Sequence, residues 1–572
     1  MTSPAQDHLA AEALLVRLRE CGVEYLFANG GTDFPPIVEA LARGATAGAE
    51  MPQPVTAPHE TLAVGMAHGY YLVTGRPQAA IVHVNVGLGN ATMPLMNAAS
   101  DNVPIVMMSG RTPITESGRS GSRSSQIHWG QEMRDQTALV RETVKWDYEL
   151  RYGDQAASLA DRAMSVAVAA PRGPVYLSLP REPLAEVIPG ALEKTGRTGP
   201  KTLVAGTRPA AEAIAAAAKL LAGARYPLIV VQRPSDLVDG FGSLVPLAER
   251  LGAAVVEFAP TRNAFPMEHP LHAGYQPDPW LADADVVLCL DTLVPWTSGR
   301  KKLKADCKVI QVAIDPLFTR TPVRDFPADM ALAGDHELVA VDLLAALGQG
   351  TAEERKAVEA RTAEIAGRVK KHREGMLEKA RAGNAKSATT TLWVSHCLNE
   401  AIDRNAAVFT ELGCNPSVMS FTKPGTLFRT PLSGGLGWGL PAALGAQLAD
   451  RDRLVVACVG DGSYLFSNPA ACHQLAGTMK LPVLFIVFNN GHWGAVRRAT
   501  EGMYPDGAAM KANSMPVTAL EPETDYAAYA RASGGFGETV MTGEDVPAAL
   551  KRALHAVKVE KRQALLNVRL AL

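Results

Sequence analysis

The sequence predicts an α/β protein of three consecutive doubly wound domains, each with a parallel sheet covered by helices on both faces. Short, uniformly apolar segments alternate with helical segments along most of the 572 residues. Uniformly apolar strands are typical of parallel sheets, because helices bury both of their faces. A chain of this length has room for about three or four domains of ordinary size.

The first predicted domain covers residues 1–185 and ends before a polar linker. Its expected elements include a helix around 9–19 and strands at 79–86 and 104–109. Residues 189–206 are rich in Gly, Thr and Pro. Such a composition is typical of the connection between two domains.

The second predicted domain is central and Rossmann-like, residues 200–345, and the third covers 388–572. The expected central strands are 227–231, 253–258, 285–290 and 308–314. Between these two domains, residues 346–387 contain a charged helical stretch at 352–382. A run of Glu, Lys and Arg on a helix favours an exposed connector over a binding patch.

Composition argues against several classes of protein. The sequence has 47% hydrophobic and 20% charged residues and a formal net charge of −2, so no attraction to nucleic acid or to a membrane surface is indicated. No apolar run reaches the length of a membrane span. The seven cysteines form no C-x-x-C pair, and their odd number argues against a disulfide framework. Residues 1–8 lack the pattern of a secretory signal, so we expect a cytoplasmic protein.

Two polar strings follow neighbouring apolar strands in the third domain. Gly-Asp-Gly at 460–462 closes the strand 454–459, and Asn-Asn at 489–490 closes the strand 482–488. Strands joined by a crossover helix are parallel neighbours, so both strings should reach the same edge of the sheet. The aspartate and the second asparagine are therefore expected side by side.

The carboxylate of Asp461 should lie beside the amide of Asn490, with free backbone N–H groups at Gly462 and Ser463. One crossover helix, with Asn468 as its N-cap, is expected between the two strands. Oxygen ligands beside free amides suit a magnesium ion that carries a diphosphate. The sequence has no Walker string G-x-x-x-x-G-K-[ST] and no EF-hand spacing of carboxylates, so other phosphate and calcium loops are not indicated.

This pair of strings resembles the signature of the thiamine-diphosphate (ThDP) enzymes that include benzoylformate decarboxylase, pyruvate decarboxylase and acetolactate synthase. The resemblance implies that Asp461, Asn490 and the backbone carbonyl of His492 bind Mg²⁺. It also implies a wider set of residues around the diphosphate: Gly460, Asp461, Gly462, Ser463, Asn490 and His492.

The segment 58–70 resembles the part of these enzymes that carries the cofactor-activating glutamate, which is Glu60 here. The resemblance implies that the carboxyl group of Glu60 shares a proton with the aminopyrimidine ring of the cofactor, which would help the cofactor to lose its C2 proton. Taken alone, Glu60 is a helix-start residue favoured by the helix dipole. A zinc-protease motif is excluded, because Ala63 stands where H-E-x-x-H needs its second histidine.

The glycine-rich turn at 433–439 resembles the turn that lies under the cofactor in this family. The resemblance implies that Gly435 and Leu436 contact ThDP, with Leu436 holding its two rings in a bent conformation. Glycine lets a backbone approach a ligand closely. Without the family, the same segment reads as a strand-to-helix turn with small residues for packing.

Local strings resemble benzoylformate decarboxylase in particular. His83 stands four residues before the string at 87–90, the place of the catalytic histidine, and Thr32 takes the place of the substrate-binding serine. His269, which precedes a proline, matches a second active-site histidine. Taken alone, His83 reads as a core histidine in an apolar strand. A histidine that transfers protons benefits from a pKa near neutrality.

Some residues depart from the pattern of benzoylformate decarboxylase. Ala499 takes the place of an aromatic residue that walls the benzoylformate pocket, which indicates a wider pocket. Arg497 or Arg498 would then lie near its mouth, and the alternative is that both arginines are surface residues. Residues 131–132 keep the glutamine and glutamate of a string found in acetolactate synthases. The substrate is therefore not settled by the sequence.

We expect a ThDP- and magnesium-dependent decarboxylase of 2-oxo acids that can also act as a carboligase. The alternatives are an acetolactate synthase with FAD in the central domain and a 2-hydroxyacyl- or oxalyl-CoA lyase with ADP there, although the sequence indicates neither nucleotide. A nucleotide-dependent oxidoreductase is a distant alternative, because no G-x-G-x-x-G string follows a central strand. Since Glu60 and Asp461 lie in different domains, the family implies a homodimer or homotetramer with active sites at the subunit interface.

Overall fold

The computed structural model describes residues 7–192, 194–237, 240–297, 303–512 and 514–571. The chain divides into two compact units. Unit 1 consists of Met1–Val204, Pro431–Asp452 and Ser463–Leu481, and unit 2 of Ala205–Thr430, Arg453–Gly462 and Pro482–Leu572. Unit 1 thus combines the start of the chain with two segments that the sequence assigns to the third domain.

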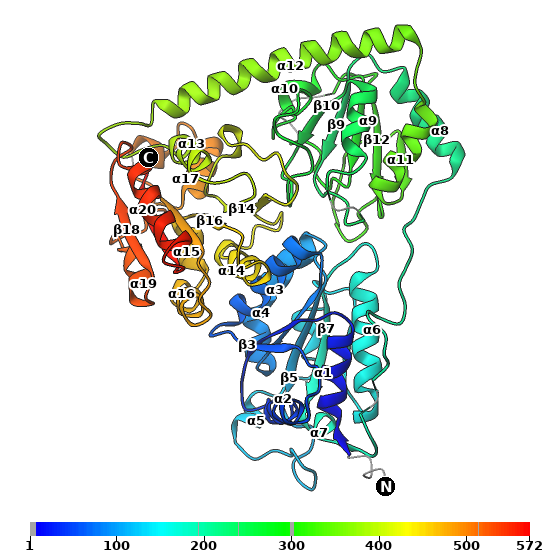
Figure 1. Ribbon diagram of the computed structural model, residues 1–572, viewed down its shortest axis with the longest axis vertical. Coiled ribbons are helices and arrows are strands. Elements are labelled where there is room, and N and C mark those ends of the chain that lie inside the picture. Colours follow the sequence, from blue (N-terminus) through cyan, green and yellow to red (C-terminus); the bar gives the residue numbers. More distant parts are fainter. Residues whose placement is uncertain (1–6, 193, 238–239, 298–302, 513, 572) are drawn as a thin grey trace. The chain divides into compact units, whose positions relative to one another are not determined.

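Unit 1 is built on a six-stranded parallel sheet in the order β3-β2-β4-β5-β7-β6. Figure 1 labels β3, β5 and β7 of this sheet. The strands are β2 (Tyr25–Asn29), β3 (Gln53–Thr56), β4 (Gln78–Val82), β5 (Ile105–Arg111), β6 (Asp147–Glu149) and β7 (Val175–Pro180). The central strands are buried along almost their whole length, as the apolar sequence predicts for strands covered on both faces. A two-stranded antiparallel sheet, β1 (His8–Leu9) with β8 (Val187–Ile188), completes the unit.

Helices cover both faces of this sheet. One core joins alternate strand residues, such as Ala79 and Ile81, to α1 (Ala10–Glu20), α2 (Pro35–Ala47) and α6 (Ala156–Val168). The other face carries α3 (Glu60–Thr74) and α4 (Val84–Ser100) (Figure 1). Short elements fill the connections: α5 (Ile127–Gly130), η1 (Thr137–Leu139), η2 (Gly153–Gln155) and α7 (Arg181–Leu184).

Helix α3 packs almost backbone to backbone on α14 (Gly439–Ala449), which also belongs to unit 1 together with α16 (Pro469–Thr478). A Cβ added at Gly69 would lie 1.9 Å from the carbonyl oxygen of Ala442, and one at Gly445 would lie 2.1 Å from that of Met66. Only glycine permits such an approach. This contact fixes the helix that begins with Glu60.

The first sheet of unit 2 has five parallel strands in the order β10-β9-β11-β12-β13. The strands are β9 (Pro227–Val231), β10 (Ala254–Glu257), β11 (Val286–Leu290), β12 (Lys308–Ala313) and β13 (Met330–Ala333). Their helices are α8 (Ala211–Ala222), α9 (Leu244–Leu251), α10 (Asp278–Leu281) and α11 (His336–Leu347). The predicted central strands coincide with the first four of these within one residue at each end.

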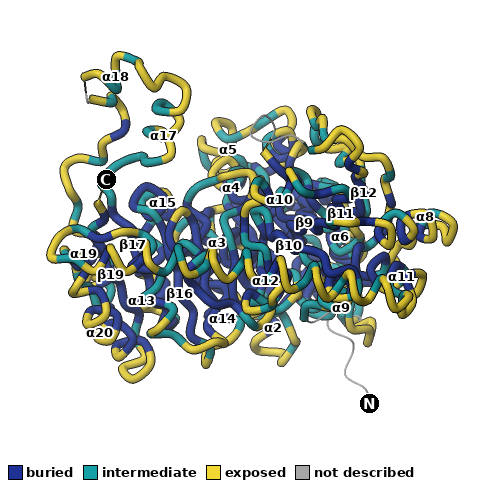
Figure 2. Tube along the Cα trace, turned by 90° about the horizontal axis from the view of Figure 1, so that it is seen from above, coloured by how far each residue is buried: buried dark blue, intermediate teal, exposed yellow. Residues whose placement is uncertain are grey.

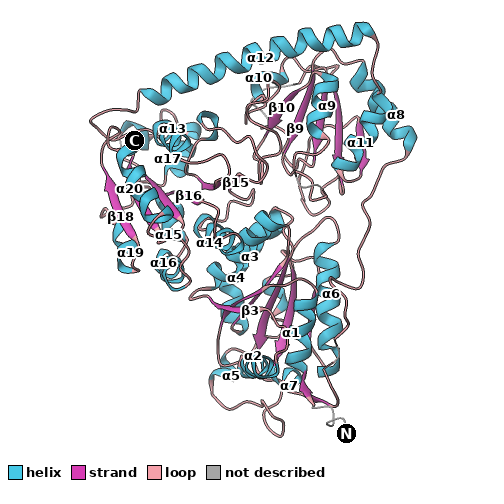
Figure 3. Ribbon diagram, in the orientation of Figure 1, coloured by secondary structure: helices cyan, strands magenta, loops and turns pink. Residues whose placement is uncertain are grey.

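The second sheet of unit 2 has six parallel strands in the order β15-β14-β16-β17-β19-β18. Figure 3 labels β15, β16 and β18 of this sheet. The strands are β14 (Ala407–Glu411), β15 (Leu427–Arg429), β16 (Val455–Gly460), β17 (Leu484–Asn489), β18 (Phe536–Val540) and β19 (Ala564–Arg569). Helices α13 (Thr391–Ala401) and α20 (Val546–Lys558) pack on it through one apolar core. The remaining elements of unit 2 are η3 (Pro416–Val418), α17 (Gly494–Met503), α18 (Ala508–Lys511) and α19 (Tyr526–Ala532). Helix α15 (Asp461–Phe466) begins in unit 2 and continues into the segment of unit 1 that starts at Ser463.

The predicted fold class is correct: the three larger sheets are parallel and covered by helices. Helix α12 (Ala352–Arg381) coincides with the charged helical stretch predicted at 352–382, and only two of its residues, Ile365 and Ala380, are buried, as expected for an exposed connector. Among the described residues, no helix combines the length and the apolar character needed to cross a membrane.

Two local predictions were wrong. The strand expected at 79–86 ends at Val82, because the N–H of Val84 bonds to a side chain instead of continuing the ladder. The single crossover helix expected after residue 462 is in fact two helices, α15 and α16. Asn468 does precede α16, but its side chain makes no capping hydrogen bond, and its Nδ2 lies 3.3 Å from Nδ1 of His59.

Candidate active site

The edge of the C-terminal sheet brings the two polar strings together. Strands β16 and β17 pair in parallel with Gly460 opposite Phe488, so Asp461 follows at the level where β17 ends. The N–H of Gly491 donates to Oδ2 of Asp461 at 2.7 Å. Asp461 is only 3% exposed. The acidic side chain therefore lies against the loop that begins with Asn490.

The carboxylate of Asp461 is held in a site that disfavours its charge. Burial raises its pKa above the ordinary value, and nearby backbone N–H groups only partly offset this effect. One of these groups belongs to Gly462, which donates to Oδ1 at 2.9 Å. The expectation that this N–H is free was therefore wrong. A bound cation would favour the ionised carboxylate.

The loop after β17 turns back on itself. The N–H of His492 donates to Oδ1 of Asn490 at 2.9 Å, and Nδ1 of His492 lies 3.0 Å from the carbonyl oxygen of Asn490. The His492 ring is thus engaged within its own loop. Asp461, the Asn490 amide and the His492 carbonyl each carry oxygen, the donor type that Mg²⁺ prefers, and their joint role as metal ligands stays a prediction.

Two further observations fit a ligand at this place. A Cβ at Gly462 would lie 2.2 Å from the ring of Trp493, so only glycine fits there. The hydroxyl of Ser463 is buried and has no hydrogen-bond partner in the described part of the chain. Buried polar groups are nearly always paired, so an unpaired one is a candidate for binding a ligand. No three side chains of His, Cys, Asp or Glu gather into a metal cluster among the described residues.

In unit 1, Glu60 begins helix α3 and is nearly buried, with 9% exposure. Nδ1 of His59 accepts from the N–H of Thr61 at 3.2 Å and so caps the helix. Nδ2 of Asn90 donates to Oε2 of Glu60 at 3.2 Å. A Cβ at Gly87 would lie 3.2 Å from Oε1, so the carboxyl group rests on bare backbone of α4.

The glycine-rich turn is fixed by one buried amide of α4. Asn97 accepts from the N–H of Gly435 at 3.1 Å and donates to its carbonyl oxygen at 2.8 Å. A Cβ at Gly435 would lie 2.6 Å from Oδ1 of Asn97. The next residue, Leu436, is partly exposed. Helix α4 therefore holds both Glu60 and the turn that the sequence assigns to the cofactor.

His83 stands between β4 and α4, at the carboxyl end of the sheet, and not within a strand as expected. Its Nδ1 lies 2.5 Å from Oδ1 of Asp33, and the N–H of Val84 donates to Oδ2 of the same carboxylate at 3.2 Å. A Cβ at Gly31 would lie 2.1 Å from Nδ1 of His83. The ring is thus packed on bare backbone and held by a buried carboxylate.

The electrostatics of His83 follow from this contact. The hydrogen bond to Asp33 raises the pKa of His83 above its ordinary value, burial opposes the rise, and the charge of Glu60 adds to it. His128, on α5, responds in the opposite direction: burial and nearby positive charges lower its pKa. The contact with Asp33 therefore favours the protonated form of His83 relative to a free histidine.

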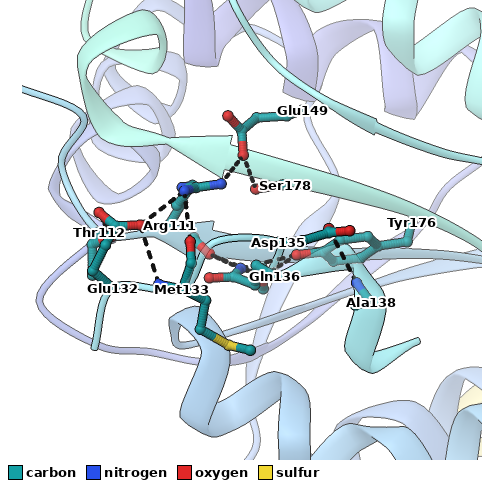
Figure 4. A network of polar contacts seen from close by, with 12 residues as sticks. Arg111, Thr112, Glu132, Met133, Asp135, Gln136, Ala138, Glu149, Tyr176 and Ser178 are labelled. Atoms are coloured by element: carbon teal, nitrogen blue, oxygen red, sulfur yellow. Dashed lines mark hydrogen bonds and ion pairs between the residues drawn. The ribbon is translucent and has the colours of Figure 1, made fainter. Parts of the chain in front are cut away.

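The loop that faces His83 is anchored by a polar network (Figure 4). Arg111, at the end of β5, bonds to Glu132 at 2.8 Å and to Glu149 at 2.6 Å. Gln136 donates to the carbonyl oxygen of Gly110 at 2.8 Å. The segment between Glu132 and Gln136 is consequently tied to the sheet at both ends.

This anchoring places Gln131 against His83. Their Nε2 atoms lie 3.2 Å apart. The sequence drew attention to Gln131 only as part of a string shared with acetolactate synthases. Its contact with His83 could not be inferred, because the two residues are 48 positions apart and lie on different loops.

The two other predicted catalytic residues, Thr32 and His269, make contacts outside the groups described above. Thr32 is exposed, and its carbonyl accepts from Arg181 at 3.3 Å. In the central domain, Nε2 of His269 lies 3.2 Å from Glu249, and its Nδ1 accepts from the N–H of Leu271 at 3.2 Å. Neither set of contacts tests the predicted catalytic roles, which stay predictions.

Sequence reasoning missed three residues that the structure gives a place in the site: Asp33, Asn90 and Asn97. For two of them the sequence contains a pattern that could have identified them. Asp33 directly follows the Gly-Gly-Thr string after β2, and Asn90 ends the string 87–90 that had drawn attention to His83. Asn97 had none, since its partner lies in the glycine-rich turn more than 300 residues away.

The chain belongs to the thiamine pyrophosphate enzymes. Family models match three successive segments: the N-terminal TPP binding domain at residues 9–139, the central domain at 214–344 and the C-terminal TPP binding domain at 411–568. Their order agrees with the three sheets. The protein is therefore a ThDP-dependent lyase or transferase.

Individual relatives cover nearly the whole chain. Benzoylformate decarboxylase of Pseudomonas aeruginosa is 28% identical over 558 residues, 94% of this chain and 95% of the relative. A probable acetolactate synthase of Mycobacterium bovis is 27% identical over 581 residues, 99% and 96% of the two chains. The solved ThDP-dependent 4-hydroxybenzoylformate decarboxylase of Rhodococcus jostii RHA1 has the same fold, with a TM-score of 0.76, 22% identity and coverage of 98% and 99%.

Proposed function

We propose that this protein is a magnesium- and ThDP-dependent decarboxylase of 2-oxo acids, similar to benzoylformate decarboxylase, with carboligase activity. The observation that carries the proposal is the contact of Asp461, which follows β16, with the loop that follows β17 and begins at Asn490. The similarity to the P. aeruginosa benzoylformate decarboxylase supports the choice of aryl 2-oxo acids.

The donor set fits the cofactor and its metal. Asp461, the Asn490 amide and the His492 carbonyl would hold Mg²⁺. The residues that would hold the diphosphate and the rings are Gly460, Gly462, Ser463, Gly435 and Leu436. When bound, ThDP supplies an electron sink for breaking the bond between a carbonyl carbon and a carboxylate.

The protein itself would position groups and move protons. Asn90 binds Oε2 of Glu60, which leaves Oε1 to hold a proton toward the cofactor. His83 would donate a proton from Nε2 to the substrate-derived group, a role that suits its raised pKa. Thr32 would bind the substrate carboxylate through its hydroxyl, and His269 would take part from the central domain.

Carboligation in the manner of acetolactate synthase is the second candidate. Gln131, part of the string shared with those synthases, contacts His83 directly. The similarity to the probable acetolactate synthase of M. bovis points the same way. Decarboxylation and carboligation differ in whether a proton or a second carbonyl compound is captured first.

The test is carbon dioxide release from benzoylformate and from pyruvate with Mg²⁺ and ThDP present. We expect turnover of benzoylformate, reduced about 100-fold or more by Glu60→Gln. Glu39→Gln, the same change at an exposed position of α2, is the matched control and should leave turnover unaltered.

Other outcomes of these assays would favour one of the alternative functions. Acetolactate formed from pyruvate would favour the synthase, and a yellow protein would add FAD. ThDP binding without use of either acid would move the search to CoA thioesters. Absence of ThDP binding would overturn the proposal.

The active assembly is proposed to be a homodimer or homotetramer. Helix α4 has 17 residues and no charge, yet Val86 and Met96 are 51% and 46% exposed. Helix α17 has no buried residue, and its Met503 is 72% exposed (Figure 2). Exposed apolar helix faces of this kind are typical of protein interfaces. Light scattering should give a multiple of 60.6 kDa, reduced by Met96→Glu.

A further inference from the structure

The surroundings of His83 contain two side chains to which no role has been given, Asp33 and Gln131. One lies at each ring nitrogen: Asp33 at Nδ1, 2.5 Å away, and Gln131 at Nε2, 3.2 Å away. Asp33 is 5% exposed. A buried carboxylate on one side of an imidazole and an amide on the other determine which nitrogen carries the exchanging proton.

The carboxylate of Asp33 is confined to its present orientation. Its Oδ1 faces the ring of His83, and its Oδ2 accepts from the N–H of Val84. A Cβ at Gly110 would lie 1.6 Å from Oδ2, so the carboxylate fills space that only a glycine leaves. Both carboxylate oxygens thus have partners, and the side chain lies in space that any side chain at position 110 would occupy.

The backbone next to His83 is strained in a way that serves this contact. Val84 has φ +27°, a value that a β-branched residue seldom adopts. The strained conformation directs its N–H to Asp33. Strain of this kind costs of the order of 1–3 kcal/mol and is typical of functional sites.

We propose that Asp33 is a positioning residue that keeps a proton on Nδ1 of His83, so that only Nε2 exchanges a proton. The Gln131 amide, which can either donate or accept a hydrogen bond, is the partner of Nε2. In neutral His83, Nδ1–H donates to Asp33 and Nε2 accepts from the Gln131 amide N–H. In protonated His83, Nε2–H donates to the amide oxygen after the Gln131 amide rotates. When Nε2 gives up its proton, the Nδ1–H bond to Asp33 is unchanged.

Other charged groups near His83 do not replace Asp33. Glu60, from α3, adds to the rise in the pKa of His83 but lies beyond hydrogen-bond distance of it. His128, from α5, also lies within the electrostatic reach of His83, and burial together with the charges of Arg181 and Arg123 lowers the pKa of His128 itself. Asp33 is the carboxylate in direct contact.

The role of the proton rests on the proposed function, whereas the pairing can be tested without turnover. Histidine-selective NMR of the full-length protein, with Mg²⁺ and ThDP added, gives the pKa of His83, assigned by the loss of its signal in His83→Gln. We expect Asp33→Asn to lower that pKa by about one to two pH units. Asp135→Asn, which removes an exposed carboxylate of the anchored loop, should not change it.

A second measurement needs no variant of Asp33. The ¹⁵N shifts of the neutral wild-type ring should place the proton on Nδ1, and a proton on Nε2 would overturn the proposal. An unchanged pKa of His83 in Asp33→Asn would also overturn it. In active protein, the pH profile of kcat for Asp33→Asn should shift to lower pH, as the pKa of His83 does in the NMR titration. A protein that decarboxylates neither acid but gives the expected NMR result would refute the proposed function alone.

Discussion

The N-terminal and C-terminal sheets have the same strand order but different chemistry at the same position. When the six strands of each sheet are numbered 1 to 6 in chain order, both sheets have the spatial order 2-1-3-4-6-5, and neighbouring strands are parallel. His83 follows the third strand of the first, and Asp461 follows the third strand of the second. In open α/β sheets, ligands bind beyond the carboxyl ends of the strands near such positions.

The two residues are held by different means. Asp461 is surrounded by backbone N–H groups, and burial raises its pKa. His83 contacts a carboxylate, and this contact raises its pKa. In the proposed function, the edge at Asp461 holds a cation and is called the cation edge, and the edge at His83 exchanges a proton and is called the proton edge. The comparison teaches that topology determines where a site lies, while a few side chains determine what it does.

The largest expected effect comes from breaking the cation edge. Asp461→Ala should abolish magnesium-dependent ThDP binding and lower turnover more than 100-fold, roughly the upper limit for loss of a supporting residue in a metal site. Calorimetry of ThDP binding at fixed Mg²⁺ measures this. Asp506→Ala, an exposed carboxylate of the same unit, is the control. Unaltered ThDP binding in Asp461→Ala would remove Asp461 from the site.

Removal of the metal should have a similar effect but be reversible. A chelator should abolish turnover, and added Mg²⁺ should restore it in the wild type but not in Asp461→Ala. Oxygen-donor sites release Mg²⁺ to strong chelators, whereas nothing at the His83 edge requires a metal. Turnover that persists after complete chelation would contradict the proposed metal site.

At the proton edge, two adjacent glycines provide a sharp contrast. In Gly31→Ala the new Cβ would lie 2.1 Å from His83, whereas in Gly30→Ala its nearest contact is 3.7 Å. Gly31→Ala should cost about 1–3 kcal/mol of unfolding free energy and displace the ring. Gly30→Ala should change stability by less than about 0.5 kcal/mol. Denaturant titration and turnover measure both, and equal effects would show that the ring is not confined.

The smallest expected effect is a pH dependence of stability. The folded-state pKa of His83 is raised above its unfolded value, so the Asp33 contact contributes fully below pH about 6.5 and is lost as the pH rises through the folded pKa. The melting temperature of Asp33→Asn should therefore fall below that of the wild type by about 1–2 °C at pH 5.5. The difference should shrink by pH 9. If the difference in melting temperature were the same at both pH values, the effect of Asp33 on stability would not depend on the charge of His83, and the prediction would be wrong.

Strand positions and the meeting of the two polar strings could be predicted from the sequence. Uniformly apolar strands followed by Gly, Asp or Asn have a clear pattern, and parallel pairing brings their ends to one edge. The end of β4 was misjudged because Val84 and Val86 are as apolar as the strand before them. Periodicity alone does not separate a buried strand from a buried helix in so short a run.

The sequence by itself determined the fold class, the order of the domains and the residue types at the cation edge, because these depend on local patterns and on nearest-neighbour strands. Only the tertiary structure decided that Asp33 and Gln131 lie at the two nitrogens of His83 and that Asn97 fixes Gly435. Those contacts join residues tens to hundreds of positions apart. They depend on glycines that let side chains approach bare backbone, which no local pattern records.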